Sequence, residues 1–177
     1  HGKSYAAVYE TEHPSGFRWL HESFGTNWRM TEMQAVLGRI QLTRMPDWTA
    51  KRTANAQAIL DVCAKWEAKG YLSVPRLEES PQFADSTHAY YKLYVYVQLN
   101  NLPKEWSRDQ IIQEINDLGV PCFSGSASEV YLEKAFDNTG LRPESRLPVA
   151  KQLGEPSLMF LVHPALAANG IKHTVQA

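Results

Sequence analysis

The chain of 177 residues is long enough for one domain, or for one domain with an appendage, and can bury a core. Apolar residues make up 44%, charged residues 21%, and the formal net charge is −1, as in ordinary soluble proteins. The basic footprint that nucleic acids or anionic membranes require is missing, and no apolar run approaches the ~20 residues that span a bilayer. Because the N-terminus is polar rather than signal-like, we expect a cytoplasmic protein.

Residues 1–30 are the least regular part of the sequence. They are rich in glycine, serine, glutamate and aromatic residues without a sustained period, so we expect an irregular arm in which one short strand would fit. A stretch of this length without structure of its own is uncommon inside a compact domain, and we expect it to pack on another part of a longer protein. Residues 31–177 should form the domain itself.

A helix begins after the arm, at Thr31. Its side chain can accept from the backbone N–H of Gln34 while Gln34 reaches back, which is a capping box. Apolar residues then recur at helical spacing, and we expect this face of the helix to join the folded core: Met33, Val36, Leu37 and Ile40. Pro46 interrupts this pattern, and a second apolar pattern runs to about Gly70. Pro46 either kinks one long helix or begins a new one, and both possibilities stay open.

The remainder alternates between strands and helices. Alternation over 91–99 predicts a strand, and Ser107 with Gln110 forms a second capping box at the start of a helix over 107–119. A short strand (120–123), a helical turn (129–135), a helix (143–153), a buried strand (157–162) and a partial helix after Gly170 complete the order. We therefore expect an α/β fold, a two-layer sandwich in which a small, partly antiparallel sheet is covered by helices.

A Gly-x-Asn-x-Arg loop, residues 25–29, lies immediately before the helix that Thr31 begins. Unpaired N–H groups and the positive end of the dipole at a helix N-terminus favour anions, so an amide and a guanidinium held there suit a phosphate or carboxylate. A turn asparagine and a solvent-exposed arginine would give the same residues.

Together with this loop, three later segments resemble, in order, the sugar aminotransferases of the DegT/DnrJ/EryC1/StrS family. They are His-Ala-Tyr-Tyr-Lys-Leu-Tyr at 88–94, Leu-Gly-Val-Pro at 118–121 and Leu-Val-His-Pro at 161–164. The resemblance covers nearly the whole chain. It implies the C-terminal small domain of a fold-type-I enzyme that uses pyridoxal phosphate to convert a ketosugar nucleotide into an aminosugar. It also implies an amino donor, usually glutamate, and an obligate homodimer whose active sites borrow residues from the neighbouring subunit.

In that family the lysine that binds the cofactor covalently lies upstream of the position where this chain begins. None of the chain's nine lysines lies in a matching context. We therefore interpret the chain as a C-terminal fragment without the Schiff-base lysine, and expect the fragment alone to be inactive. The family would also continue past Ala177.

The resemblance assigns binding roles to residues near the loop and near the aromatic strand. Asn27 corresponds to the residue that contacts the cofactor phosphate across the dimer interface. Arg29 is either a substrate-phosphate ligand or a structural ion-pair partner. His88, Tyr90 and Tyr91 begin the strand that borders the active site, and we expect one of them to orient the sugar.

Four further positions are candidate substrate contacts. Ser124 and Ser126 lie in a hydroxyl-rich loop at the C-terminal end of a strand, where α/β folds tend to place ligands. Many family members instead have Tyr-Pro with a following His there, and Tyr131 is a candidate replacement. His163 is either a substrate contact or a satisfied structural histidine. The departure of the loop 124–128 is the only support for an alternative function, a non-catalytic binding or assembly module on the same fold.

Other sites lack support in the sequence. Cys63 and Cys122 have no C-x-x-C spacing and lie in apolar patterns, so we expect buried free thiols, and no metal-ligand spacing occurs among the histidines. Hydrolase, dinucleotide and nucleotide-loop motifs are missing. Tyrosines 90, 94 and 96 suggest a stacking platform for single-stranded nucleic acid, but such platforms accompany a basic groove, and the net charge of −1 opposes one. The segment 124–146 has few periodic apolar residues, and we expect it to be mobile or ordered only by contacts outside the chain.

Overall fold

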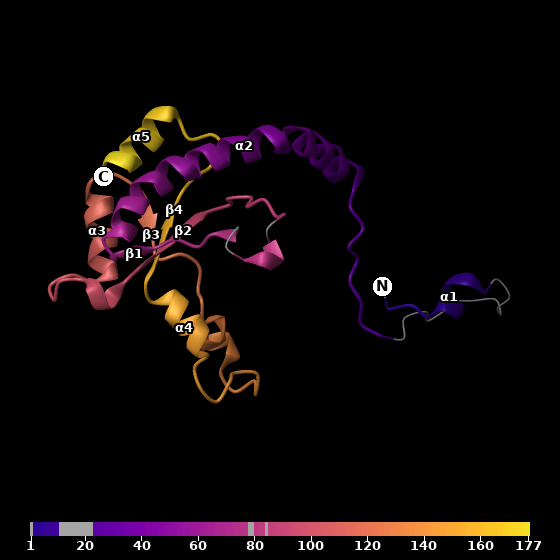
Figure 1. Ribbon diagram of the computed structural model, residues 1–177. Helices are drawn as coiled ribbons and strands as arrows, with labels where there is room; N and C mark the ends of the chain where they lie inside the picture. Colours follow the sequence, from indigo (N-terminus) through magenta and orange to yellow (C-terminus); the bar gives the residue numbers. More distant parts are fainter. Residues whose placement is uncertain (1, 11–22, 78–79, 84) are drawn as a thin grey trace. The chain divides into compact units, whose positions relative to one another are not determined.

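A computed structural model describes residues 2–10, 23–77, 80–83 and 85–177 (Figure 1). The chain divides into two compact units, His1–Arg44 and Met45–Ala177. Helix α1 (Tyr5–Tyr9) lies in the first unit, where the sequence indicated at most a short strand, and residues 11–22 of the expected arm lie outside the described residues. Helix α2 (Glu32–Ala68) begins in the first unit and continues into the second.

Helix α2 is one helix of 37 residues with Pro46 inside it, so the alternative of two separate helices is excluded. The predicted capping box holds its start. The Thr31 N–H donates to the Gln34 side-chain oxygen at 2.9 Å, and the Gln34 N–H donates to the Thr31 hydroxyl at 3.3 Å. These two bonds satisfy backbone donors that have no partner within the helix.

The first half of α2 leaves its apolar face exposed. Met33 is 78% exposed, Val36 57% and Leu37 59%. We expected these residues to join the core, and that expectation is wrong. Helical periodicity shows only that one face needs a partner, and it does not show whether the partner lies in the same unit. Burial along α2 begins at Ala56.

The second unit is built on a four-stranded sheet of order β1-β2-β4-β3. The strands are β1 (Leu72–Ser73), β2 (Leu93–Val97), β3 (Cys122–Phe123) and β4 (Ser157–Phe160). All pairings among the described strands are antiparallel, with Leu93 and Cys122 on either side of Phe160. The pattern of 91–99 predicted β2, and Leu93, Val95 and Val97 of its apolar face are buried, whereas Tyr91 and Leu99 lie outside the strand and are exposed. Strand β1 is too short to show any period.

Helices cover one face of this sheet, which confirms the two-layer arrangement. They include α2 and α3 (Arg108–Asp117), while α4 (Pro148–Gly154) and α5 (Ala168–Gln176) follow later in the chain (Figure 1). Val95 on β2 and Ala56 on α2 are fully buried in this core. Cys63 and Cys122 are buried free thiols, as predicted, and burial raises the pKa of each to about 11.

Asn116 fastens α3 to β3. Its side-chain N–H donates to the Cys122 carbonyl at 2.9 Å, and its side-chain oxygen accepts from the Cys122 N–H at 3.1 Å. Cys122 is only 1% exposed, so water cannot replace these bonds without rearrangement.

We expect Asn116→Ala to lower the free energy of unfolding by roughly 1–3 kcal/mol, because it leaves buried backbone groups of Cys122 without partners. Urea unfolding measures the change. Gln113→Ala is the matched control, since the Gln113 amide bonds to Asp117 on the exposed side of the same helix. Equal effects of the two substitutions would contradict this role of Asn116.

Candidate functional site

The Asn27 loop belongs to the first unit, and its residues 23–30 are all exposed. The Asn27 side-chain oxygen accepts from the backbone N–H of Arg29 at 3.2 Å and from the Arg29 guanidinium Nε at 3.1 Å. These two bonds hold the Asn27 side chain within the loop, and the loop leads directly into the capped start of α2.

His88 and Tyr90 form a small aromatic pair just before β2. The backbone N–H of Tyr90 donates to His88 Nδ1 at 3.0 Å, and the two rings lie 4.3 Å apart. Tyr90 has a φ of +43°, in the left-handed region that disfavours L residues. The hydrogen bond from the Tyr90 N–H to His88 therefore stabilises a turn that the backbone conformation of Tyr90 alone would not favour. Tyr91 points outward, with 77% of its surface exposed.

His163 follows β4 and is exposed. Its Nδ1 accepts from the Ala165 N–H at 3.2 Å, and the Asn55 side chain on α2 donates to the carbonyl of His163 at 3.2 Å. Since Leu93 lies opposite Phe160 in antiparallel strands, the residues before β2 and those after β4 lie at the same end of the sheet. The structure thus brings His88, Tyr90 and His163 to one end of the sheet.

Ser124 and Ser126 lie in the loop that follows β3, beside Tyr94. The Ser157 hydroxyl donates to the Ser124 carbonyl at 2.6 Å, and the Ser126 N–H donates to the Tyr94 hydroxyl at 3.3 Å. Gly125 has a φ of +92°, and a Cβ atom there would lie 2.4 Å from the Tyr94 ring. Only glycine fits this close approach. Both serine side chains remain on the surface of a loop that is fixed to β2 and β4.

Tyr131 is buried, and its hydroxyl is already engaged. It donates to the Glu129 carboxylate at 2.6 Å and accepts from the Leu147 N–H at 2.8 Å. Arg146 pairs with the same carboxylate, and the bonds from Arg146 and Tyr131 lower the pKa of Glu129 to about 2. A ligand could use the Tyr131 hydroxyl only by breaking these bonds, and its substrate role stays a prediction.

The same network corrects our expectation for residues 124–146. Arg142 adds a bond from its Nε to the Tyr131 carbonyl at 2.8 Å and an ion pair to Asp137 at 2.6 Å. Partners within the chain therefore hold this segment. The sequence carries no sign of the Glu129–Arg146 pair, because the two residues lie 17 positions apart in a segment without a sustained period.

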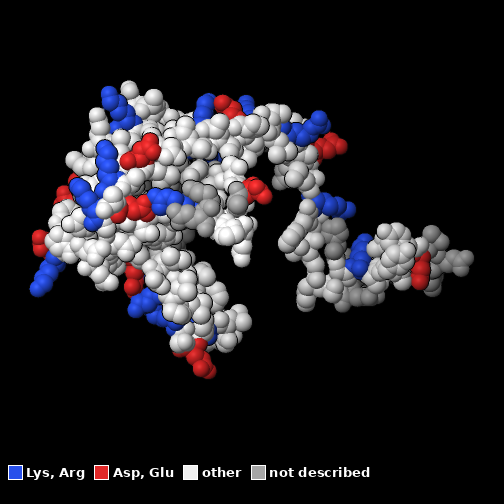
Figure 2. Space-filling view, in the orientation of Figure 1, with Lys and Arg blue, Asp and Glu red and all other residues white. Residues whose placement is uncertain are grey.

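The described residues also bear on other classes of site. No group of three or more histidine, cysteine, aspartate or glutamate side chains among them could hold a metal ion. Among the described helices, none is both long and apolar enough to cross a membrane. Tyr94 and Tyr96 are partly buried, and both acidic and basic side chains lie on the viewed face of the second unit (Figure 2).

The sequence profile of the DegT/DnrJ/EryC1/StrS aminotransferase family matches residues 8–177. The chain is 30% identical over 158 residues to the erythromycin biosynthesis sensory transduction protein EryC1 of Saccharopolyspora erythraea, covering 89% of this chain and 38% of that protein. It is 26% identical over 149 residues to the dTDP-3-amino-3,4,6-trideoxy-alpha-D-glucose transaminase of Streptomyces venezuelae, covering 84% and 35%. The chain thus spans little more than a third of the length of these relatives.

Solved structures agree with these matches. The aminotransferase from Psychrobacter cryohalolentis is 89% identical, with a TM-score of 0.84, over 99% of this chain and 45% of that chain. The PLP form of a sugar aminotransferase, Spr1654 from Streptococcus pneumoniae, shares the fold with a TM-score of 0.58 at 21% identity, over 83% of this chain and 34% of its own.

The Glu129 network predicts a pH-dependent stability. Because its pKa is lowered from 4.5 to about 2, Glu129 stabilises the fold at pH values above about 4.5 and loses this contribution as the pH falls toward 2. We expect Glu129→Gln to lower the melting temperature near neutral pH, with a difference from the wild type that shrinks between pH 4.5 and 2. Glu133→Gln, in the same segment, is the control. A difference that stays constant over this pH range would rule out the charged pair as its source.

Proposed function

The chain belongs to the DegT/DnrJ/EryC1/StrS aminotransferase family, and we propose that it is the C-terminal part of an enzyme that transfers an amino group to a nucleotide-linked ketosugar. The proposed cofactor is pyridoxal phosphate, and the proposed donor is glutamate. The observation that carries the proposal is the 89% identity to an aminotransferase over 99% of the chain. The name of the Streptomyces venezuelae relative, a dTDP-aminosugar transaminase, supports the substrate class.

The Asn27 loop fits the phosphate of such a cofactor. A carboxamide can donate to a phosphate oxygen without adding a charge, and its bonds to Arg29 hold the Asn27 side chain within the loop before α2. When bound, pyridoxal phosphate supplies the electron sink for amino transfer. No lysine of this chain matches the family's Schiff-base context, and we assign that lysine to a part of the enzyme outside this chain.

We place the sugar-side wall at the end of the sheet where His88, Tyr90 and His163 meet. His88 accepts a hydrogen bond from the Tyr90 backbone, so the position of its ring is fixed before any ligand arrives. Ser124 and Ser126 would add hydroxyl groups from a loop that Tyr94 holds in place. Preorganised polar groups of this kind orient a substrate at little entropic cost.

We further propose that the enzyme is a homodimer. The exposed apolar face of the first half of α2 continues into the loop before it, where Trp28 is 88% exposed. An exposed apolar face of this kind marks an interaction surface. If a second subunit covers this face, Asn27 of one subunit lies at the edge of the active site of the other. This arrangement would account for the position of the Asn27 loop on the surface.

The chain by itself should show no transaminase activity. We expect no covalently bound cofactor after incubation with pyridoxal phosphate and borohydride reduction, because the required lysine is absent. Mass spectrometry of digested protein measures the labelling, with the full-length enzyme as the positive control. One lysine labelled stoichiometrically in this chain would overturn the prediction, whereas scattered surface labelling would not.

In the full-length enzyme, Asn27→Ala should weaken cofactor binding. Loss of one hydrogen bond to a charged phosphate costs roughly 1–3 kcal/mol, or about one to two decades in affinity. Cofactor titration followed by absorbance measures this change. Arg29→Ala is the comparison variant, since it removes only the guanidinium bond to Asn27 and keeps both the bond from the backbone N–H of residue 29 and the Asn27 amide. Unchanged cofactor affinity with a lowered melting temperature would make Asn27 a structural turn residue.

A further inference from the structure

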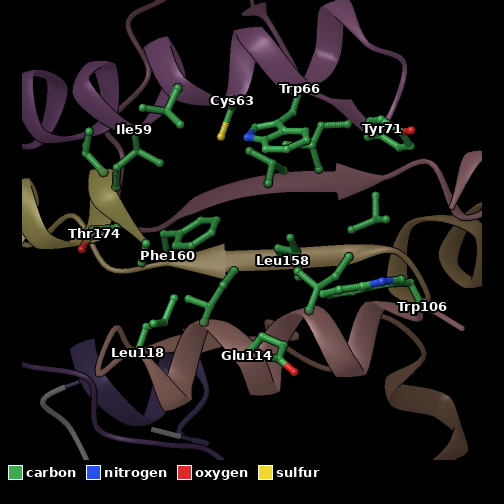
Figure 3. A pocket seen from close by; sticks show the side chains of 18 of the residues that line it. Ile59, Cys63, Trp66, Tyr71, Trp106, Glu114, Leu118, Leu158, Phe160 and Thr174 are labelled. Atoms are coloured by element: carbon green, nitrogen blue, oxygen red, sulfur yellow. The ribbon is translucent and has the colours of Figure 1, made fainter. Parts of the chain in front are cut away.

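Arg52 lies on the inward face of α2, one turn before Ala56, which is fully buried. Farther along the same face, Ile59 and Cys63 point toward the sheet (Figure 3). The Nε atom of Arg52 is buried as well, and it is the only buried side-chain nitrogen or oxygen of the described residues without a hydrogen-bond partner. An unbonded buried donor is unfavourable, and most of all on a charged group. Arg52 therefore needs a partner that the described residues do not supply.

The course of α2 places Arg52 at the end of the sheet where we put the sugar-side wall. The other end of the sheet lies beside the end of α2, since the N–H of Gln98, just after β2, donates to the Tyr71 carbonyl at 2.8 Å. Toward the wall, the Asn55 side chain donates to the carbonyl of His163 at 3.2 Å. Residues three apart are neighbours on one helix face, and long side chains lean toward the helix N-terminus. Arg52 thus lies next to Asn55, on the side of the wall.

The two histidines at this end of the sheet present hydrogen-bond donors. His88 Nδ1 accepts from the Tyr90 N–H at 3.0 Å, and His163 Nδ1 accepts from the Ala165 N–H at 3.2 Å. A ring nitrogen that accepts a hydrogen bond carries no proton, so the proton of each ring lies on Nε2. Both residues are exposed. The wall therefore offers N–H groups beside a guanidinium, and the group that matches them is an acceptor with negative charge.

A carboxylate fits these donors better than a diphosphate does. A guanidinium binds a carboxylate through two parallel N–H groups, and the Nε–H can be one of them. Arg52 brings one positive charge, which one carboxylate balances, whereas a diphosphate brings more than one negative charge. The neighbouring cation on α2, Lys51, is already paired with Asp47 at 2.9 Å.

We propose that Arg52 is a substrate-binding residue that holds a carboxylate of one of the two substrates. This proposal rests on the proposed function, because it takes this end of the sheet as the sugar-side wall. Glutamate, the proposed amino donor, carries two carboxylates, and a nucleotide-linked sugar acid would carry one. In either case the carboxylate gives the substrate a fixed point beside His88 and His163, which orients the reacting group.

Steady-state kinetics of the full-length enzyme with both substrates test this role. Arg52→Gln removes the charge, and we expect the KM for one substrate to rise roughly tenfold or more, because a charged hydrogen bond is lost. A raised KM for glutamate identifies the donor carboxylate, and a raised KM for the ketosugar identifies a sugar acid. Arg52→Lys keeps the charge without the two-point geometry and should raise the same KM less. Lys51→Gln, which removes the exposed neighbouring charge, is the matched control and should leave both KM values unchanged.

The absorbance of bound pyridoxal phosphate separates this proposal from the proposed function. If neither substrate changes that absorbance in the wild type, the proposed function fails and the role of Arg52 fails with it. If the wild type responds and Arg52→Gln responds at the same concentrations of both substrates, only the role of Arg52 is wrong. Unchanged KM values with a lowered melting temperature would make Arg52 a structural residue and would also overturn the proposal. If Arg52→Gln does not fold, Arg52→Lys decides between the same outcomes.

Discussion

The packing of α2 against β2 and β4 is the contact on which the second unit depends. Ala56 and Val95 meet in it without any exposed surface, and Ile59 and Cys63 extend it along the helix. Antiparallel pairing of β2 with β4 then determines where the polar residues lie. The segments before β2 and after β4 come to one end of the sheet, and Asn55 ties that end to the same helix. The candidate sugar-side wall is therefore a consequence of the core.

Helix α2 also has two different roles along its length. Its second half supplies the core, whereas its first half exposes an apolar face and follows the Asn27 loop. The proposed phosphate-binding role of the Asn27 loop, on an exposed helix start, would suit a site shared with a neighbouring subunit. The apolar pocket of the second unit, which residues of α2, α3 and α5 line, is a second uncovered apolar surface (Figure 3).

Local rules predicted much of this fold. The capping box formed at Thr31, the Ser107 hydroxyl caps the Gln110 N–H, and alternation placed Leu93, Val95 and Val97 inward, because these features depend on neighbours in the sequence. Features that depend on distant partners were missed. The pairing of Glu129 with Arg146 and the exposure of Met33 are examples, since neither periodicity nor spacing states what lies opposite a side chain. The roles of the candidate site residues came from the family resemblance, and the geometry adds that His88, Tyr90 and His163 lie at one end of the sheet.

We propose that this chain is the C-terminal part of a sugar aminotransferase. The most direct measurement follows nitrogen transfer by the full-length enzyme from ¹⁵N-labelled glutamate to a panel of nucleotide-linked ketosugars, with mass spectrometry of the products. We expect one nucleotide sugar to gain a single labelled amino group in a reaction that depends on the cofactor. Label that appears on no nucleotide sugar, while the enzyme is folded and saturated with pyridoxal phosphate and transfers nitrogen to another class of acceptor, would contradict it.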